Sequence, residues 1–223
     1  MQKKTIFTPF VALLVMLFSS QASAVLIDFI DLTQKAGGLG ESSWASLSAS
    51  DHPDLDHFGF NVTGHASTDT DSDQFAYLDW GNAGLGVCKD ATGAGENPGS
   101  SANSCDPSSD DNVTVGEWLE FSFTQDVEVS LWFNNNHDGG FVAGDMVTIG
   151  ALDLSVSEGY AGGANGLGIF EVAAGEILKV AYNNQEFYVS GMSVNAVPVP
   201  AAIWLFGTAL IGFIGFGRRT NVA

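Results

Sequence analysis

Two neighbouring stretches of the sequence alternate apolar and polar residues with a period of two, which is the pattern of a strand that buries one face. They are residues 118–124 (WLEFSFT) and 127–133 (VEVSLWF), and only Gln125 and Asp126 separate them. So short a link predicts an antiparallel hairpin, with Trp118 and Trp132 on its core face. Similar stretches, separated by turns rich in Gly, Asn and Asp, predict further strands at residues 25–32, 43–48, 57–65, 75–80, 146–149, 152–156, 168–172, 177–182 and 187–194.

Many short strands and no convincing amphipathic helix between the two ends of the chain predict an all-β fold. We expect an antiparallel β-sandwich or jelly-roll-like domain over residues 25–195, which is long enough for one hydrophobic core. Residues 81–111 are rich in Gly, Ser, Asn and Asp, and we expect them to form a long irregular loop.

The N-terminus has the three parts of a secretory signal peptide. Lys3 and Lys4 supply the positive charge, residues 6–18 are mostly apolar, and Ala22-Ser23-Ala24 is a small-x-small cleavage site. We therefore predict that signal peptidase removes residues 1–24. An uncleaved signal anchor is the alternative, and the shortness of the apolar run argues against it.

The C-terminus carries an uncharged apolar run at residues 201–217, followed by Arg218 and Arg219. Such a run is at the short end of what spans a bilayer, and the arginine pair is a membrane stop that keeps the end of the chain in the cytoplasm. Pro198 and Pro200 precede the run and should end the last strand. The sequence thus predicts a transmembrane helix in a tail of residues 196–223, and a plain membrane anchor is its simplest interpretation.

The order of proline motif, apolar helix and basic end resembles the sorting tail of PEP-CTERM proteins. The matching residues are Val197, Pro198, Val199, Pro200 and Ala201, followed by residues 204–207 (WLFG). The main form of the family has Glu between the prolines, where this chain has Val199. The resemblance implies recognition by an exosortase, a membrane protease of Gram-negative bacteria that make extracellular polysaccharide, acting at or near Pro198–Pro200. Residues 84–88, 116–119 and 187–192 also resemble domains that PEP-CTERM proteins carry, which implies a β-sandwich without assigned functional residues.

The charge of the central region restricts its partners. All 26 acidic residues but only three of the seven basic ones lie between Val25 and Pro200, which gives this region a net charge of −23. Such a domain repels nucleic acid and anionic lipid. The charge suits calcium or a cationic partner, and it is equally explained by solubility outside the cell.

Cys88 and Cys105 are the two cysteines of the chain, and in an oxidising compartment we expect them to form a disulfide. Four oxygen-bearing residues follow the second cysteine, and together they predict a calcium site that orders the loop. A polar loop kept soluble by its charge is the alternative. The four residues are Asp106, Asp110, Asp111 and Asn112.

Two other polar stretches are weaker candidates. Asp69, Asp71 and Asp73 begin like an EF-hand loop, but Gln74 and Trp80 stand where that loop needs Gly and Glu, so an EF-hand is rejected. Residues 134–140 (NNNHDGG) offer groups for sugar hydroxyls or a metal, and the same residue types are what a turn needs.

No spacing in the sequence places a nucleophile beside a base or pairs two carboxylates, so we expect no enzymatic activity. The chain is expected to cross the inner membrane, to be transiently membrane-anchored, and then to reach the cell surface or medium. We predict a surface-sorted protein of the exopolysaccharide or biofilm matrix with a non-catalytic sandwich. A calcium-dependent carbohydrate-binding or adhesive module is the alternative, in which exposed Trp side chains would stack on sugar rings. A secreted polysaccharide hydrolase is a third, weaker hypothesis.

Overall fold

The computed structural model describes residues 24–34, 40–44, 58–67, 75–90, 105, 111–197 and 206–207. One compact unit, residues 23–196, contains the β-sheets. The predicted signal peptide and most of the predicted sorting tail lie outside the described residues. Within the described residues, no helix combines the length and apolar character needed to cross a membrane.

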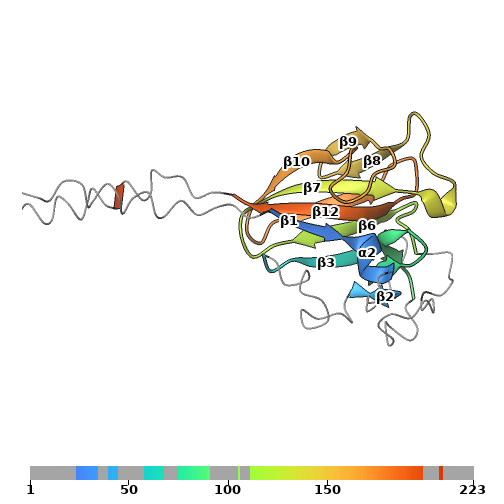
Figure 1. The fold of residues 1–223 in the computed structure, drawn as a ribbon, viewed down its shortest axis with the longest axis horizontal. Coiled ribbons are helices and arrows are strands. Elements are labelled where there is room, and N and C mark those ends of the chain that lie inside the picture. The colour runs from blue at the N-terminus through green and yellow to red at the C-terminus, as the bar shows by residue number, and fades with distance from the viewer. Residues whose placement is uncertain are drawn as a thin grey trace, which may run out of the picture. The chain divides into compact units, whose positions relative to one another are not determined.

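Two antiparallel sheets form the layers of a sandwich, which confirms the predicted all-β class (Figure 1). Sheet A has seven strands in the order β10-β7-β12-β5-β4-β2, with β1 also beside β12, and sheet B has five in the order β3-β6-β11-β8-β9. The strands of sheet A are β1 (Ala24–Asp28), β2 (Ser42–Ser43), β4 (Phe75–Asp79), β5 (Gly84–Cys88), β7 (Val127–Asn134), β10 (Leu167–Val172) and β12 (Tyr188–Ala196). The strands of sheet B are β3 (Asn61–Ala66), β6 (Glu117–Ser122), β8 (Met146–Ile149), β9 (Leu152–Ser155) and β11 (Ile177–Tyr182).

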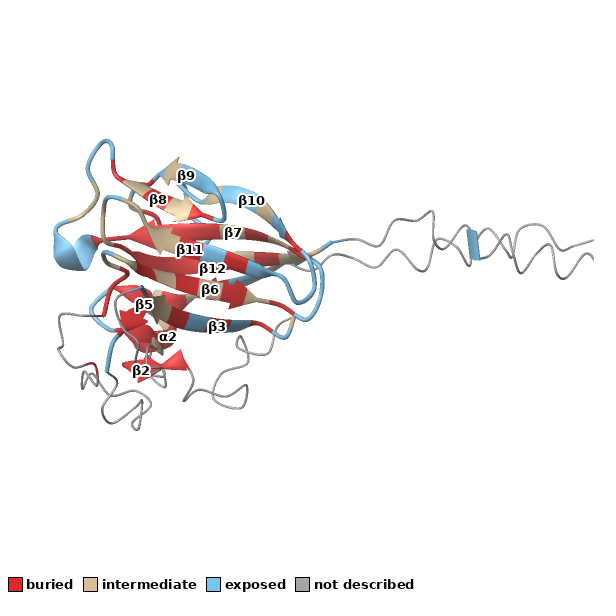
Figure 2. Cartoon of the chain, turned by 180° about the vertical axis from the view of Figure 1, so that it is seen from behind, coloured by how far each residue is buried: buried red, intermediate tan, exposed pale blue. Residues whose placement is uncertain are grey.

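The core lies between the sheets and is built from the inward residue of each pleat. Figure 2 shows the buried residues concentrated in the central strands, whereas β9 and β10 are largely exposed. Phe60, directly before β3, stacks on Phe121 and Phe123 of the neighbouring segment of sheet B, with ring centroids 6.0 and 5.6 Å apart. The alternation visible in the sequence is therefore the physical cause of the two-layer structure.

The predicted hairpin of residues 118–124 and 127–133 is wrong. β6 belongs to sheet B, where it pairs with β3 and β11, and β7 belongs to sheet A, where it pairs with β10 and β12. The link of residues 123–126 carries the chain from one layer to the other. The buried residues of both strands, such as Leu119 and Val129, then belong to the same inter-sheet core.

Two local expectations also need correction. The stretch 25–32 is a strand only as far as Asp28, and it continues as a short helix, α2 (Phe29–Gln34), which lies against β12, β4 and β5. Asp28 starts this helix because its Oδ1 accepts a hydrogen bond from the backbone N–H of Asp31 at 2.9 Å. The region 81–111, expected to be irregular, contains the fully buried strand β5.

Glycines explain how β5 fits there. A Cβ on Gly86 would overlap the carbonyl oxygen of Asp111, and a Cβ on Gly84, at a φ of 123°, would lie 2.6 Å from the carbonyl oxygen of Val189. Only glycine allows both neighbouring segments to approach so closely. Gly86 therefore allows the backbone of Asp111 to lie against β5, an inner strand of sheet A.

Candidate functional site

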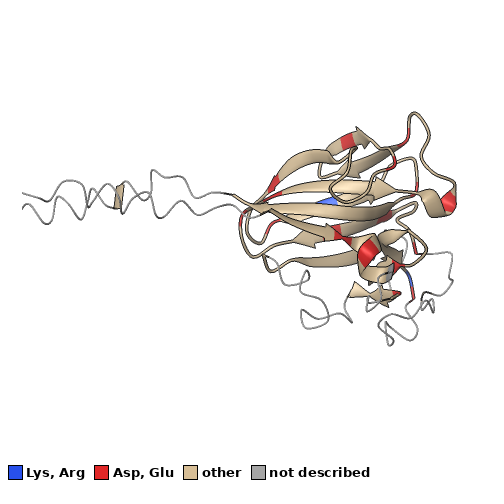
Figure 3. Cartoon of the chain, in the orientation of Figure 1, with Lys and Arg blue, Asp and Glu red and all other residues tan. Residues whose placement is uncertain are grey.

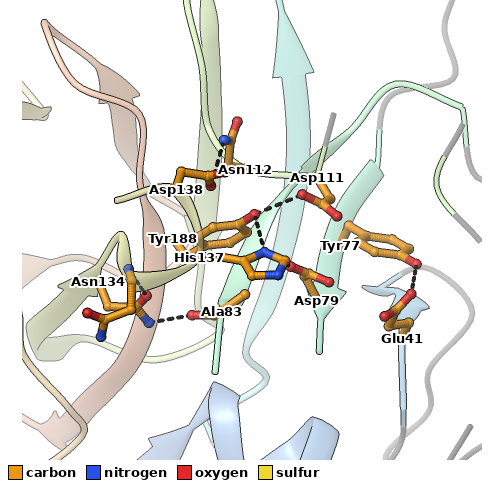
Figure 4. Close-up of polar contacts among 11 residues, drawn as sticks. Glu41, Tyr77, Asp79, Ala83, Asp111, Asn112, Asn134, His137, Asp138 and Tyr188 are labelled. Carbon is orange, nitrogen blue, oxygen red and sulfur yellow. Dashed lines mark hydrogen bonds and ion pairs between the residues drawn. The ribbon is translucent and has the colours of Figure 1, made fainter. Parts of the chain in front are cut away.

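Four polar side chains meet at one end of sheet A, and we call them the Asp–His cluster (Figure 4). Asp79 is the last residue of β4, and Tyr188 is the first of β12. His137 lies in the 3-10 helix η4 (Asn136–Asp138), which follows β7. Asp111 is held against β5, where the next residue accepts a hydrogen bond at its carbonyl from the N–H of Val87.

Metal-binding atoms in the cluster are close together. Each of three residues offers one ligand atom, and these three atoms lie within 4.8 Å of one another. The residues are Asp79, Asp111 and His137. Oδ2 of Asp79 is 3.3 Å from Nδ1 of His137. The hydroxyl of Tyr188 donates a hydrogen bond of 2.8 Å to Oδ1 of Asp111, and it lies 3.5 Å from the same Nδ1.

Burial differs sharply within the cluster. Asp79 and Asp111 are only 2% and 3% exposed, and Tyr188 is fully buried, whereas the side chain of His137 is 47% exposed. Despite its burial, Oδ2 of Asp79 accepts no hydrogen bond from the residues that the structure describes. The approach of Nδ1 is thus a short contact without hydrogen-bond geometry.

The electrostatics reflect this crowding of acids. Burial first, and then the charges of Asp111 and Glu41, raise the pKa of Asp79 from 3.8 to about 8. Burial also raises the pKa of Glu41 to about 7, although a hydrogen bond from Tyr77 opposes the shift. The pKa of Tyr188 is raised for the same reason, burial first and the charge of Asp111 second. Without a cation, the protons held on these acids offset the repulsion.

The loop that carries His137 is fixed by a single carboxylate. Oε1 of Glu158 accepts a hydrogen bond of 2.9 Å from the N–H of Phe141, and both its oxygens lie 3.3 Å from the N–H of Asn135. The carbonyl of Asn135 accepts hydrogen bonds from the N–H groups of Asp138 and Gly140. Because these bonds close the loop on itself, His137 projects from a rigid support.

A second contact joins the loop to the Asp111 segment. Nδ2 of Asn112 donates to Oδ2 of Asp138 at 3.3 Å. At the start of the loop, Nδ2 of Asn134 donates to the carbonyl of Ala83, which belongs to the turn between β4 and β5. The three segments that form the cluster are therefore cross-linked around it.

The predicted disulfide between Cys88 and Cys105 is confirmed. Cys88 is the last residue of β5 rather than part of a loop, and both cysteines pack with Tyr77 on one buried patch. The bridge thus ties the segment that leads to Asp111 directly to sheet A.

The structure reaches only part of the predicted calcium site. It describes Asp111 and Asn112, and it brings Asp111 to Asp79 and His137 rather than into a loop of its own. Of the sorting motif it describes Val197 alone. Asp106 and Asp110, the motif residues Pro198, Val199, Pro200 and Ala201, and the stop residues Arg218 and Arg219 lie outside the described residues, as do Asp69, Asp71 and Asp73.

Sequence reasoning missed Asp79 and Tyr188, and it treated His137 only as one member of a turn-like polar stretch. In the sequence, Asp79 resembles the end of a strand, and Tyr188 resembles an ordinary aromatic residue of a strand. The one usable signal was the polar run 134–140, which begins at the last residue of β7.

The expected core position of Trp118 is wrong, whereas Trp132 is buried as expected, although outside the inter-sheet core cluster. Trp118 lies on the outer face of sheet B, where it stacks on His65 at 5.4 Å and carries the ammonium of Lys179 at 3.8 Å over its ring. Trp132 is buried, but by the loop that contains Gly163, whose carbonyl accepts its indole N–H at 3.0 Å. Trp80, which directly follows Asp79, is 46% exposed.

Comparison with protein-family models, curated proteins and solved structures gave no match. The functional argument therefore depends on the residues of this chain.

Proposed function

We propose that this chain is an exported, surface-sorted protein of the exopolysaccharide or biofilm matrix, and that its sandwich acts by binding rather than catalysis. The observation that carries the proposal is the Cys88–Cys105 disulfide. Disulfides persist in oxidising compartments outside the cytoplasm, which agrees with the signal-peptide pattern of residues 1–24. Signal peptidase would release the N-terminus, and an exosortase would process the tail that begins at residue 196.

The direction of β12 supports a tethered role. The strand starts at Tyr188 in the Asp–His cluster and ends at Ala196, just before the sorting motif. At about 3.3 Å per residue, its ends are roughly 26 Å apart. The cluster and the point where the chain leaves the sandwich thus lie at opposite ends of one strand, so attachment through the tail leaves the cluster unobstructed.

The charge distribution supports an extracellular role without nucleic acid. Acidic side chains occur across the described part of the sandwich, while its basic residues are Lys89 and Lys179 (Figure 3). Lys179 is engaged with Trp118. A surface of this kind repels other polyanions and favours cations.

Mass spectrometry of the protein recovered from its own cells tests this proposal. We expect an N-terminus at Val25 and a C-terminus within or near the motif Val197–Ala201. A matched variant with Pro198→Ala and Pro200→Ala should keep the signal-peptide cleavage and lose the tail processing. Recovery of a wild-type chain that still ends in Arg218-Arg219-Thr220-Asn221-Val222-Ala223 would contradict exosortase processing.

One observation favours the sugar-binding part of the second candidate, a calcium-dependent carbohydrate-binding or adhesive module, although the imidazole of the cluster does not suit calcium. Trp80 is 46% exposed and directly follows Asp79 in the chain, so an exposed aromatic residue lies one position from a group that can hold a cation. The near-complete burial of Asp79 and Asp111 favours binding over hydrolysis, because a sugar ring cannot lie between them. A glycan array with and without calcium tests this candidate, and an array without hits contradicts it.

A further inference from the structure

We propose that Asp79, Asp111 and His137 form a binding site for one divalent transition-metal ion, with Zn²⁺ as its best fit. The two carboxylates and one imidazole come from three separate chain segments, and their ligand atoms converge within 4.8 Å. This inference concerns the folded domain alone, and it holds whether or not the chain is sorted to the cell surface.

The separation of the donors matches a shared ion. Zinc binds His nitrogen and carboxylate oxygen at about 2.0–2.2 Å, so adjacent donors of a tetrahedral site are roughly 3.4 Å apart. Nδ1 of His137 and Oδ2 of Asp79 are 3.3 Å apart. All three ligand atoms lie within 4.8 Å of one another, so the Asp111 carboxylate would complete the set after a movement on the order of 1 Å.

An independent observation also indicates a ligand here. Oδ2 of Asp79 is buried and accepts no hydrogen bond from any described residue, although it points at His137. Buried charged atoms in proteins are normally paired or coordinate a metal. A cation between the carboxylate and the imidazole would satisfy this atom without any rearrangement of the sheet.

The supporting contacts are those of a metal site. Tyr188 donates its hydroxyl hydrogen to Oδ1 of Asp111, and this bond holds the Asp111 carboxylate beside Asp79 and His137. Glu158 fixes the loop that presents His137. Such outer contacts orient the ligands and raise metal affinity.

The donor set selects the ion. Calcium is bound by six to eight oxygens in proteins, so an imidazole nitrogen at the centre of the cluster argues against it. Imidazole with carboxylate suits zinc and its neighbours in the first transition row. Three protein ligands leave a fourth position for water or a ligand hydroxyl, and the exposed side of His137 leaves room for it.

Isothermal titration of the purified full chain with ZnCl₂ tests the proposal. The protein is stripped with EDTA, dialysed and free of any polyhistidine tag, and CaCl₂ is titrated in a parallel experiment. We expect one Zn²⁺ per chain, with affinity at least tenfold weaker in His137→Ala. His65→Ala is the matched control, because His65 is half-exposed on β3 and should leave zinc binding unchanged.

The exposure of His137 means that its removal leaves the fold intact, so the variant remains informative even where Asp79→Asn fails to fold. Absence of saturable zinc binding overturns the proposal, and so does equal binding by the wild type and His137→Ala. Calcium binding that needs Asp79 but not His137 would also overturn the proposed zinc site, because the ligands would then be oxygens alone. Because the measurement uses purified protein, it is independent of the processing experiment.

Discussion

Asp79→Asn is expected to stabilise the metal-free protein at alkaline pH while it abolishes stabilisation by zinc. The carboxyl of Asp79 has its pKa raised from 3.8 to about 8, by burial first and then by Asp111 and Glu41. His137 and Tyr188 also face it. Between pH 4 and pH 8, Asp79 keeps its proton in the folded state and releases it in the unfolded state. Its contribution to the free energy of unfolding is therefore complete below about pH 4, and it is lost as the pH rises to 8.

The size of the effect follows from that window of about four pH units. At about 1.4 kcal/mol per unit, ionisation of Asp79 lowers the free energy of unfolding by at most roughly 6 kcal/mol. Water that enters with the charge relaxes part of this cost, so we expect a loss of about 3 kcal/mol between pH 4 and 8. Asparagine has the same shape and no ionisation, so the variant escapes the loss.

Urea denaturation of both proteins at pH 5 and pH 8, in EDTA and then in excess zinc, measures these terms. Self-repulsion of the acidic chain also grows with pH, so the difference between wild type and variant is the quantity to compare. In EDTA the variant should gain about 2 kcal/mol on the wild type from pH 5 to pH 8, because this range covers three of the four pH units. Zinc at a hundred times its Kd should stabilise the wild type alone, by about 2.7 kcal/mol.

Asp153→Asn is the matched control, because Asp153 is exposed on β9 and should change neither comparison. Two results together would refute the reasoning. Asp79→Asn would be less stable than the wild type at pH 8 in EDTA, and the difference in free energy of unfolding between the two proteins would be the same at pH 5 and pH 8. Asp79 would then make a favourable contact in the metal-free state, and the cluster would need no ion.

Three further variants test the surroundings of the cluster. Replacing Cys88 and Cys105 together by alanine opens a bridge across a sequence separation of 17 residues, and should lower the free energy of unfolding by about 3 kcal/mol in urea denaturation. Gly86→Ala pushes on the backbone of Asp111, and should cost about 1–3 kcal/mol in the same assay and weaken zinc binding in titration. Trp80→Ala should leave the urea midpoint unchanged and weaken retention on matrix polysaccharide about fivefold, as the loss of one stacking contact of about 1 kcal/mol implies.

Each of these has an outcome that contradicts it. An unchanged midpoint for the double cysteine variant would mean that the bridge adds nothing to stability. Normal zinc binding in Gly86→Ala would show that Asp111 does not depend on its close approach to β5. Equal retention of Trp80→Ala and the wild type would remove the aromatic surface from the binding hypothesis, with Ile169→Ala on the exposed strand β10 as a neutral reference.

Sequence alternation located many strands well, because one face of each is buried. The bounds predicted for β8 and β11 agree with the structure, at residues 146–149 and 177–182. The signal failed for one strand. Strand β5 is buried at all five positions, and its two glycines made it look like a turn.

Alternation could not identify partners. The residues Leu119 and Val129 are inward in β6 and β7, and this would hold equally for strands side by side or strands facing each other across the core. The short link between them fits both arrangements. The strand pairing shows that β6 and β7 face each other across the core. Strand β6 pairs with β3 and β11, and β7 pairs with β10 and β12.

The candidate site was hidden for a related reason. Metal sites are readable in a sequence when their ligands share one short segment, as in a helix or a loop of fixed spacing. Here Asp79 ends a strand, Asp111 follows the disulfide, and His137 lies in a turn, and each is locally unremarkable. In a sandwich, segments distant in sequence come together where strands of one sheet begin and end. β4 and β7 end, and β12 begins, at the same end of sheet A, so the topology rather than any local motif assembles the ligands there.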